Sequence, residues 1–162
     1  MSIANHTGAN HSISVTVVKE ARLATTATLA WALIRDFNAM PAWNEAVQRS
    51  HIEHGPADRI GCRRVLQFDG AGLWIHELTG LSDVDMKLQY RIVEAPQPMP
   101  IPMANYRAEM LVIADAGQDM TAPGCTIRWR AEFDTPEPES MKRRALEVFD
   151  KGFEGLRRRL SA

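Results

Sequence analysis

The sequence lacks any long apolar run. No stretch approaches the roughly 20 apolar residues that a membrane-spanning helix needs, so we expect no stable membrane insertion. The first twelve residues, MSIANHTGANHS, show no charged region followed by an apolar core, and we therefore expect no secretion signal. Together these two absences predict a cytoplasmic protein.

Cysteine is scarce as well, and net charge is close to zero. Cys62 and Cys125 lie far apart, each within a predicted strand or at its start, and we expect reduced thiols in a cytoplasmic protein. A formal net charge of −1 provides no general attraction to nucleic acid, so no nucleic-acid partner is expected.

The chain has enough apolar residues for one domain with a sizeable core or a cavity. It contains 162 residues, of which 45% are hydrophobic. We expect a flexible tail over residues 1–10 and a single domain over residues 11–162, without repeats or an interior boundary. The sequence leaves the oligomeric state open, with a homodimer as one option.

Hydrophobic periodicity predicts the order of the elements. Alternating residues indicate strands over 11–20, 45–53, 63–79 (a hairpin), 86–93, 105–113 and 124–134. A helix is expected over 25–36, with Thr25 or Thr26 as its N-cap, and a short helical turn or loop follows around residues 40–44. A long amphipathic helix spans about 140–160. Its Gly152 and Gly155 indicate either close backbone approach or room left for another group.

A curved sheet covered by one helix leaves space at one end. We expect this space to be roofed by residues 40–43 and by residues 95–103, where four prolines predict a stiff loop outside the sheet. The proline residues are Pro96, Pro98, Pro100 and Pro102. A largely apolar, preformed pocket of this kind is typical of small-molecule sites.

The hairpin 63–79 carries the most informative pattern. If Asp69–Gly72 forms the turn, residues whose numbers add to 141 face each other, which places Arg64 opposite Glu77 at about 5 Å between their Cβ atoms. Two alternatives remain: a half-exposed pair at the end of the sheet, and a one-residue register slip that turns both side chains outward. The apolar residues on the same predicted face are Leu66, Phe68, Leu73 and Ile75.

An arginine and a glutamate on an apolar face would suit proton-transfer chemistry without a cofactor. Arg64 offers donors to an enolate, carboxylate or sulfenate oxygen. Desolvation would raise the pKa of Glu77, and the charge of Arg64 would lower it. Whichever effect is larger decides whether Glu77 acts as a general base or is a passive counter-ion. Tyr90 is the third catalytic candidate, as a donor to an oxyanion or a proton relay; the alternative is a tyrosine whose hydroxyl bonds to nearby backbone.

Other residues are candidates for the cavity wall or, alternatively, plain core. Trp43 would either contact the ligand or anchor its loop. His76 is predicted on the face opposite Glu77 and is not a catalytic candidate. His51, Glu53 and His54 do not share a strand face, so we expect no metal and no cofactor. The ligand-binding candidates are Trp43, Leu66, Phe68, Ile75, Tyr106, Met110, Trp129, Phe149 and Phe153.

Four segments carry a resemblance to a known family: Trp31–Phe37, Met40–Asn44, Gly61–Arg64 and Trp74–Leu78. They resemble the polyketide cyclase/dehydrase and lipid-transport branch of the START-like (Bet v 1-like) superfamily, and the likeness runs from about residue 13 to 160. The resemblance implies an α+β helix-grip fold, in which a seven-stranded curved antiparallel sheet wraps around the last helix and leaves a ligand tunnel.

Within that branch, the Gly-x-x-Arg strand followed by Trp-x-x-Glu is similar to the plant lachrymatory factor synthases. In those enzymes an arginine and a glutamate serve a proton-transfer rearrangement of a small sulfenic acid. By motif, the resemblance carries these roles onto Arg64 and Glu77.

Three functions are compatible with these observations. The first is a lipid- or polyketide-type binding or transport protein for a small hydrophobic ligand with a polar carbonyl or acid group. The second is a cofactor-free cyclase, dehydratase or isomerase that uses the Arg64–Glu77 pair. The third is a structural or interaction domain with no ligand.

Overall fold

The chain is described here by a computed structural model that covers residues 11–96, 102–115 and 121–161. The expected tail, residues 1–10, and two of the four loop prolines, Pro98 and Pro100, lie outside the described residues. In chain order the elements are β1 (Ile13–Thr26), α1 (Ala27–Ile34), α2 (Met40–Trp43), β2 (Val47–Glu53), β3 (Arg63–Phe68), β4 (Gly72–Ser82), β5 (Lys87–Glu94), β6 (Ala104–Ala114), β7 (Pro123–Thr135) and α3 (Pro138–Leu160).

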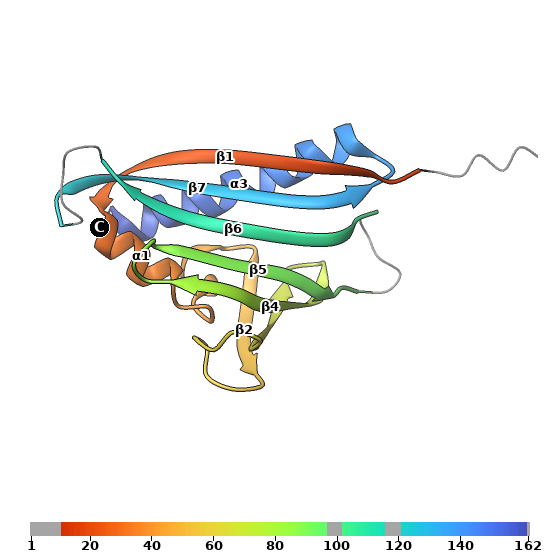
Figure 1. Cartoon of the computed structure of the whole chain (residues 1–162), viewed down its shortest axis with the longest axis horizontal. Helices are drawn as coiled ribbons and strands as arrows, with labels where there is room; N and C mark the ends of the chain where they lie inside the picture. Colours follow the sequence, from red (N-terminus) through yellow and green to blue (C-terminus); the bar gives the residue numbers. More distant parts are fainter. Residues whose placement is uncertain (1–10, 97–101, 116–120, 162) are drawn as a thin grey trace, which may run out of the picture.

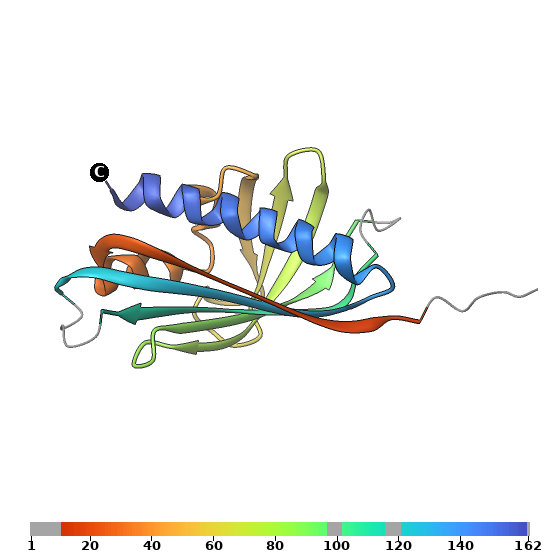
Figure 2. The same cartoon turned by 90° about the horizontal axis from the view of Figure 1, so that it is seen from above.

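The strands form one seven-stranded antiparallel sheet in the order β1-β7-β6-β5-β4-β3-β2. Strands β2 to β7 follow one another as a meander, and β1 closes onto β7 (Figure 1). The long helix α3 runs across one face of the curved sheet (Figure 2). This is the expected α+β helix-grip fold, with the seven curved strands wrapped around the C-terminal helix.

Strand β1 is longer than its alternating pattern predicts. The prediction ended it at Glu20, but the strand continues to Thr26, and its pairing with β7 runs on through the pair Leu23–Cys125. Helix α1 then begins at Ala27, after Thr26, one of the two candidate N-caps, whose hydroxyl oxygen accepts a hydrogen bond from the backbone N–H of Leu29 at 3.1 Å. The partner strand therefore decides where β1 ends, and the cap decides where α1 begins.

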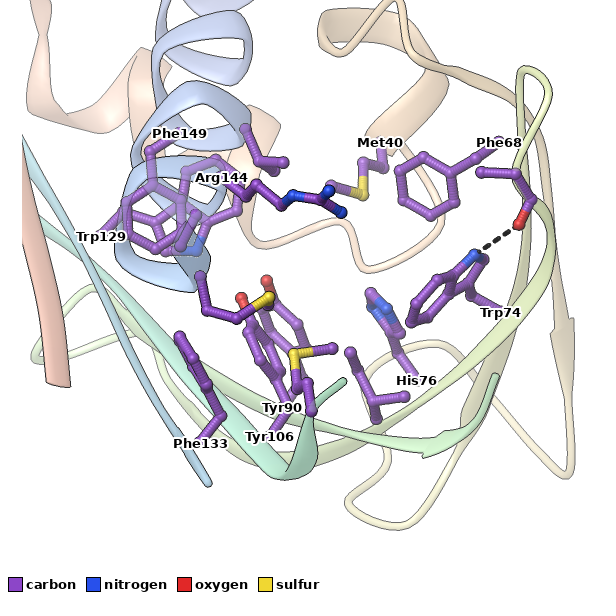
Figure 3. A pocket seen from close by; sticks show the side chains of 16 residues that line it. Met40, Phe68, Trp74, His76, Tyr90, Tyr106, Trp129, Phe133, Arg144 and Phe149 are labelled. Carbon is purple, nitrogen blue, oxygen red and sulfur yellow. Dashed lines mark hydrogen bonds between the residues drawn. The ribbon is translucent and has the colours of Figure 1, made fainter. Parts of the chain in front are cut away.

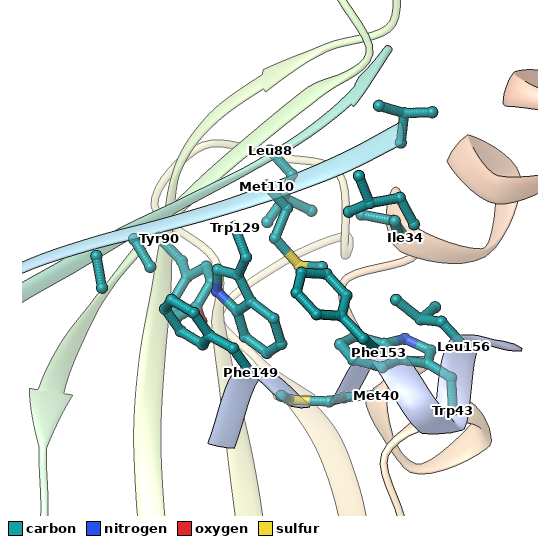
Figure 4. Close-up of a cluster of buried hydrophobic side chains, with 14 of the residues drawn as sticks. Ile34, Met40, Trp43, Leu88, Tyr90, Met110, Trp129, Phe149, Phe153 and Leu156 are labelled. Carbon is teal, nitrogen blue, oxygen red and sulfur yellow. The ribbon is translucent and has the colours of Figure 1, made fainter. Parts of the chain in front are cut away.

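An aromatic cluster joins the sheet to α2 and α3 (Figure 4). Trp129 of β7 stacks on Phe149 of α3 with ring centroids 4.5 Å apart. Trp43 of α2 and Phe153 of α3 each approach the Trp129 ring edge-on at 6.0 Å. Offset and edge-on ring contacts of this kind add to the free energy of apolar burial, so the cluster holds the helix against the sheet.

The two glycines of α3 mark close approaches. A Cβ atom on Gly155 would lie 1.6 Å from the carbonyl oxygen of Trp43, and one on Gly152 would lie 2.5 Å from the Trp129 ring. Of the two interpretations considered for these glycines, close backbone approach is the one observed at Gly155. The end of α2 is thereby pressed directly onto α3.

We predict that Gly155→Ala lowers the free energy of unfolding by about 2–3 kcal/mol, because a methyl group cannot share space with a backbone carbonyl. Chemical denaturation measures the loss. Lys151→Ala, an exposed position on the same helix, serves as the control and should change stability by less than about 0.5 kcal/mol. A Gly155→Ala protein as stable as the parent would show that α2 does not pack as described.

Candidate ligand-binding site

The β3–β4 hairpin has a tighter turn than predicted. Phe68 pairs with Gly72 across a three-residue loop, Asp69–Ala71, and the glycines at 70 and 72 have φ of +68° and +73°. The paired residue numbers therefore add to 140, with Arg64 opposite His76 and Arg63 opposite Glu77. The predicted register was wrong by one residue, because Gly72 belongs to the strand in a left-handed conformation that glycine adopts readily.

The changed register reverses the faces of β4 but not those of β3. Trp74 and His76 are buried on the inner face, whereas Glu77 lies on the outer face. The Glu77 carboxylate accepts hydrogen bonds from Arg63 at 3.1 Å and from Arg91 at 3.0 Å. Desolvation raises the pKa of Glu77, but the hydrogen bonds and charges of Arg91 and Arg63 more than offset this and hold the pKa below its usual value. The predicted Arg64–Glu77 pair is not formed.

Arg64 is buried, as predicted, with only 4% of its surface exposed. Its Nη1 donates to the carbonyl oxygen of Phe37 at 2.9 Å, and its Nη2 lies 3.1 Å from Nδ1 of His76. The guanidinium carbon sits 4.1 Å from the centre of the Phe37 ring and 5.0 Å from that of Tyr90. Burial lowers the pKa of Arg64 to about 10, so the group stays charged at neutral pH.

His76 contacts this arginine and lines the cavity described below. Its ring stacks on Tyr90 with centroids 4.9 Å apart and an interplanar angle of 12°. Burial, reinforced by the charge of Arg64, holds the pKa of His76 well below its usual value, and the imidazole is neutral at pH 7. Our prediction placed His76 on the outer face; the correct register turns it inward.

Two tyrosines follow His76 along the wall: Tyr90 stacks on its ring, and the Tyr106 ring lies 6.4 Å from that of Tyr90. Burial raises the pKa of Tyr90, although the charge of Arg64 opposes the effect. Burial, together with the neighbouring Tyr90, raises the pKa of Tyr106 well above its usual value. Both hydroxyls are protonated at neutral pH, and both rings line the same pocket (Figure 3).

These side chains line a cavity of about 220 Å³ between the sheet and α3. Four of the nine ligand-binding candidates contribute to its wall, namely Phe68, Tyr106, Trp129 and Phe149, and so does the catalytic candidate Tyr90. The sequence prediction missed other lining residues, among them Trp74, His76, Arg144 and Ala145. The alternation Trp74, His76, Leu78 would have revealed two of them if a three-residue loop had been considered.

The remaining predicted residues lie elsewhere. Leu66, Met110, Trp43 and Phe153 are buried in the core and do not line the cavity. Ile75 turns to the outer face with Glu77 because of the register. Ligand contact by the predicted residues stays a prediction, as do the catalytic roles assigned to Arg64, Glu77 and Tyr90.

The expected roof is described only in part. Met40 of α2 and Met103 line the cavity, while residues 97–101 lie outside the described residues.

The remaining sequence features do not form a site. Cys62 and Cys125 are both buried and free. Over residues 11–96, 102–115 and 121–161, no three His, Cys, Asp or Glu side chains gather closely enough to hold a metal ion. In the same residues, no helix has the length and apolarity required to cross a membrane.

Comparison with known proteins bears on the family and the fold. Residues 14–161 match the family described as polyketide cyclase / dehydrase and lipid transport. No curated protein sequence gives a significant match.

Solved structures share the fold at low sequence identity. XoxI from Bacillus cereus is similar with a TM-score of 0.77 and 20% identity, over 90% of this chain and 95% of that one. A Thermobifida fusca protein is 27% identical with a TM-score of 0.71, over 90% and 92% of the two chains. Norcoclaurine synthase from Thalictrum flavum, solved with dopamine and hydroxybenzaldehyde, has a TM-score of 0.67 and 11% identity, over 91% and 87%.

We predict that Glu77→Gln lowers the free energy of unfolding by about 1 kcal/mol or less, because both of its ion pairs lie on the outer face where water screens them. Thermal and chemical denaturation measure the change. A loss of several kcal/mol would mean that Glu77 is buried against Arg64 after all.

The neutral state of His76 predicts a pH dependence of stability. Because its folded pKa is depressed, the unfolded chain takes up a proton below about pH 6.5 that the folded chain does not, and stability is lost as pH falls. At pH values well below 6.5, His76 lowers the free energy of unfolding by up to about 1.4 kcal/mol for each further pH unit. Denaturation between pH 7 and pH 5 should show a shallower decline for His76→Gln than for the parent.

The exposed His51 provides the matched control for this measurement. His51→Gln should keep the decline of the parent chain. Identical pH profiles for His76→Gln and the parent would show that His76 is protonated in the folded protein as readily as in the unfolded one.

Proposed function

Because this chain belongs to the polyketide cyclase/dehydrase and lipid transport family, we propose that it binds a small hydrophobic ligand with a polar carbonyl or acid group in the cavity between the sheet and α3. The observation that carries the proposal is the cavity itself, whose wall is built mainly of aromatic and aliphatic side chains. Apolar concave sites with a few placed polar groups are the usual form of small-molecule sites.

The size of the cavity limits the ligand. At about 220 Å³ it is smaller than the range of about 300–1,000 Å³ that is common for drug-sized ligands, and larger than an engineered cavity of about 150 Å³ that binds benzene. A ligand with one or two rings, or a short acyl chain, fits this volume. Long lipids would have to extend beyond the mouth.

The polar groups of the cavity wall favour an oxygen acceptor on the ligand. His76, Tyr90 and Tyr106 are residues of the inner wall whose side chains carry N–H or O–H groups. Arg144 of α3 adds an exposed guanidinium, and it has no ion-pair partner among the described residues. Within the described part of the chain the wall includes no Asp or Glu. A ligand that carries a carbonyl or an acid group meets donors and positive charge here.

A cofactor-free cyclase, dehydratase or isomerase is the second candidate. The observation that favours it is the charge of Arg64, which lies 5.0 Å behind the Tyr90 ring without a carboxylate partner among the described residues. Positive charge behind a tyrosine stabilises an oxyanion that forms in front of it. The two candidates differ in the fate of the ligand, because a binding protein returns it unchanged and an enzyme returns a product.

The binding function is tested by filling the cavity. Ala145 lies on α3 in the cavity wall, so Ala145→Phe places a ring in the space that the ligand would occupy. We predict that the affinity for 2-naphthoic acid, a fluorescent two-ring probe with an acid group, falls at least 10-fold. Fluorescence titration measures the dissociation constant.

Ala32→Phe makes the same substitution on the exposed side of α1 and is the matched control. It should leave the affinity for the probe within about 2-fold of the parent. Equal affinities for the parent, Ala145→Phe and Ala32→Phe would show that the probe binds outside the cavity, and would count against the proposed function.

A further inference from the structure

The contact between Arg64 and His76 determines where the imidazole carries its proton. A guanidinium has only donors, so the 3.1 Å contact between its Nη2 and Nδ1 of His76 requires Nδ1 to accept. A neutral imidazole has a single N–H group, which must then lie on Nε2. The low pKa of His76 agrees with the neutral ring that this arrangement needs.

The Nε2–H group opens onto the cavity. His76 is one of the lining residues, and its ring rises from β4 into the pocket (Figure 3). Within the described part of the chain its Nε2 has no hydrogen-bond partner, yet it is not among the fully enclosed side-chain nitrogens that lack one. The donor therefore keeps some exposure, and His76 is one of the residues that line the cavity.

The groups around His76 all favour an acceptor in front of it. Arg64 on β3 holds its Nδ1, Tyr90 on β5 stacks on its ring, Tyr106 on β6 lies beside Tyr90, and Arg144 on α3 lines the same cavity. None of these four groups is an anion at neutral pH. In a site with little water, the buried charge of Arg64 polarises the imidazole and strengthens Nε2–H as a donor.

We propose that His76 is a specificity-determining residue of the cavity: its Nε2–H donates to a carbonyl oxygen of the ligand, and Arg64 is the positioning residue that holds the required tautomer. The inference rests on the proposed function and narrows it. The ligand class becomes small cyclic hydrophobic molecules that carry a ketone, aldehyde or ester carbonyl.

The tautomer is tested by NMR on the ¹⁵N-labelled full-length chain. Two-bond ¹H–¹⁵N correlations should give His76 an unprotonated Nδ1 and a protonated Nε2 at pH 7. Arg64→Lys, which retains a donor without acceptor capacity, should preserve this pattern, and Arg64→Met should yield a mixture of tautomers. A protonated Nδ1 in the unaltered protein would overturn the proposal.

The specificity is tested with acetophenone and ethylbenzene, which share a ring and a chain length and differ in a carbonyl against a methylene. NMR titration of cavity resonances measures both dissociation constants. We expect the preference for acetophenone to fall about 3- to 10-fold in His76→Phe, which keeps a ring against Tyr90 but lacks the donor. His51→Phe, the same change at an exposed histidine, should keep the preference.

The outcomes separate this inference from the proposed function. Equal binding of both molecules to the parent, or an unchanged preference in His76→Phe, overturns the inference while binding in the cavity stands. No shift of cavity resonances with either molecule counts against both. If His76→Phe does not fold, the tautomer measured in the unaltered chain still decides the proposal.

Discussion

The register of the β3–β4 hairpin is the constraint on which the interior depends. Gly72 takes a φ of +73° as the first residue of β4, and a Cβ atom there would lie 2.8 Å from the Pro96 ring. Both facts strongly favour glycine at this position, and the turn before it contains three residues rather than four. Relative to the predicted pairing, this shift of one residue turns Trp74 and His76 into the cavity and Glu77 out to the opposite face.

In the same register Arg64 is a buried cation that has no carboxylate partner among the described residues. Removing a charge from water costs several kcal/mol, and at Arg64 the cost is offset by neutral partners. These are the carbonyl oxygen of Phe37, Nδ1 of His76 and the faces of the Phe37 and Tyr90 rings. Because none of them neutralises the charge, its field extends to the adjacent cavity and makes that side of the wall attractive to oxygen atoms.

The cavity is the space that one helix cannot fill on a wide curved sheet. Gly155 brings α3 against the end of α2, and the rings of Trp43, Trp129 and Phe153 close the core at that end. Toward the N-terminal end of α3 the wall includes the short side chain of Ala145, and the space remains open. The fold thus supplies a pocket, and the side chains around it decide what enters.

Strand alternation and the helix stripe were sufficient to predict the α+β architecture, a threonine cap at residue 25 or 26, and the inward direction of Tyr90, Tyr106 and Trp129, because these follow from the periods of local structure. The partner of Arg64 was not predictable in this way. Asp69–Gly72 contains two glycines, and it is compatible with a three- or a four-residue turn. Only the packing of Gly72 against Pro96 and of β4 against its neighbours distinguishes these turns. Register is a property of contacts between distant segments, so tertiary structure alone decided that a histidine, and not a glutamate, faces the cavity.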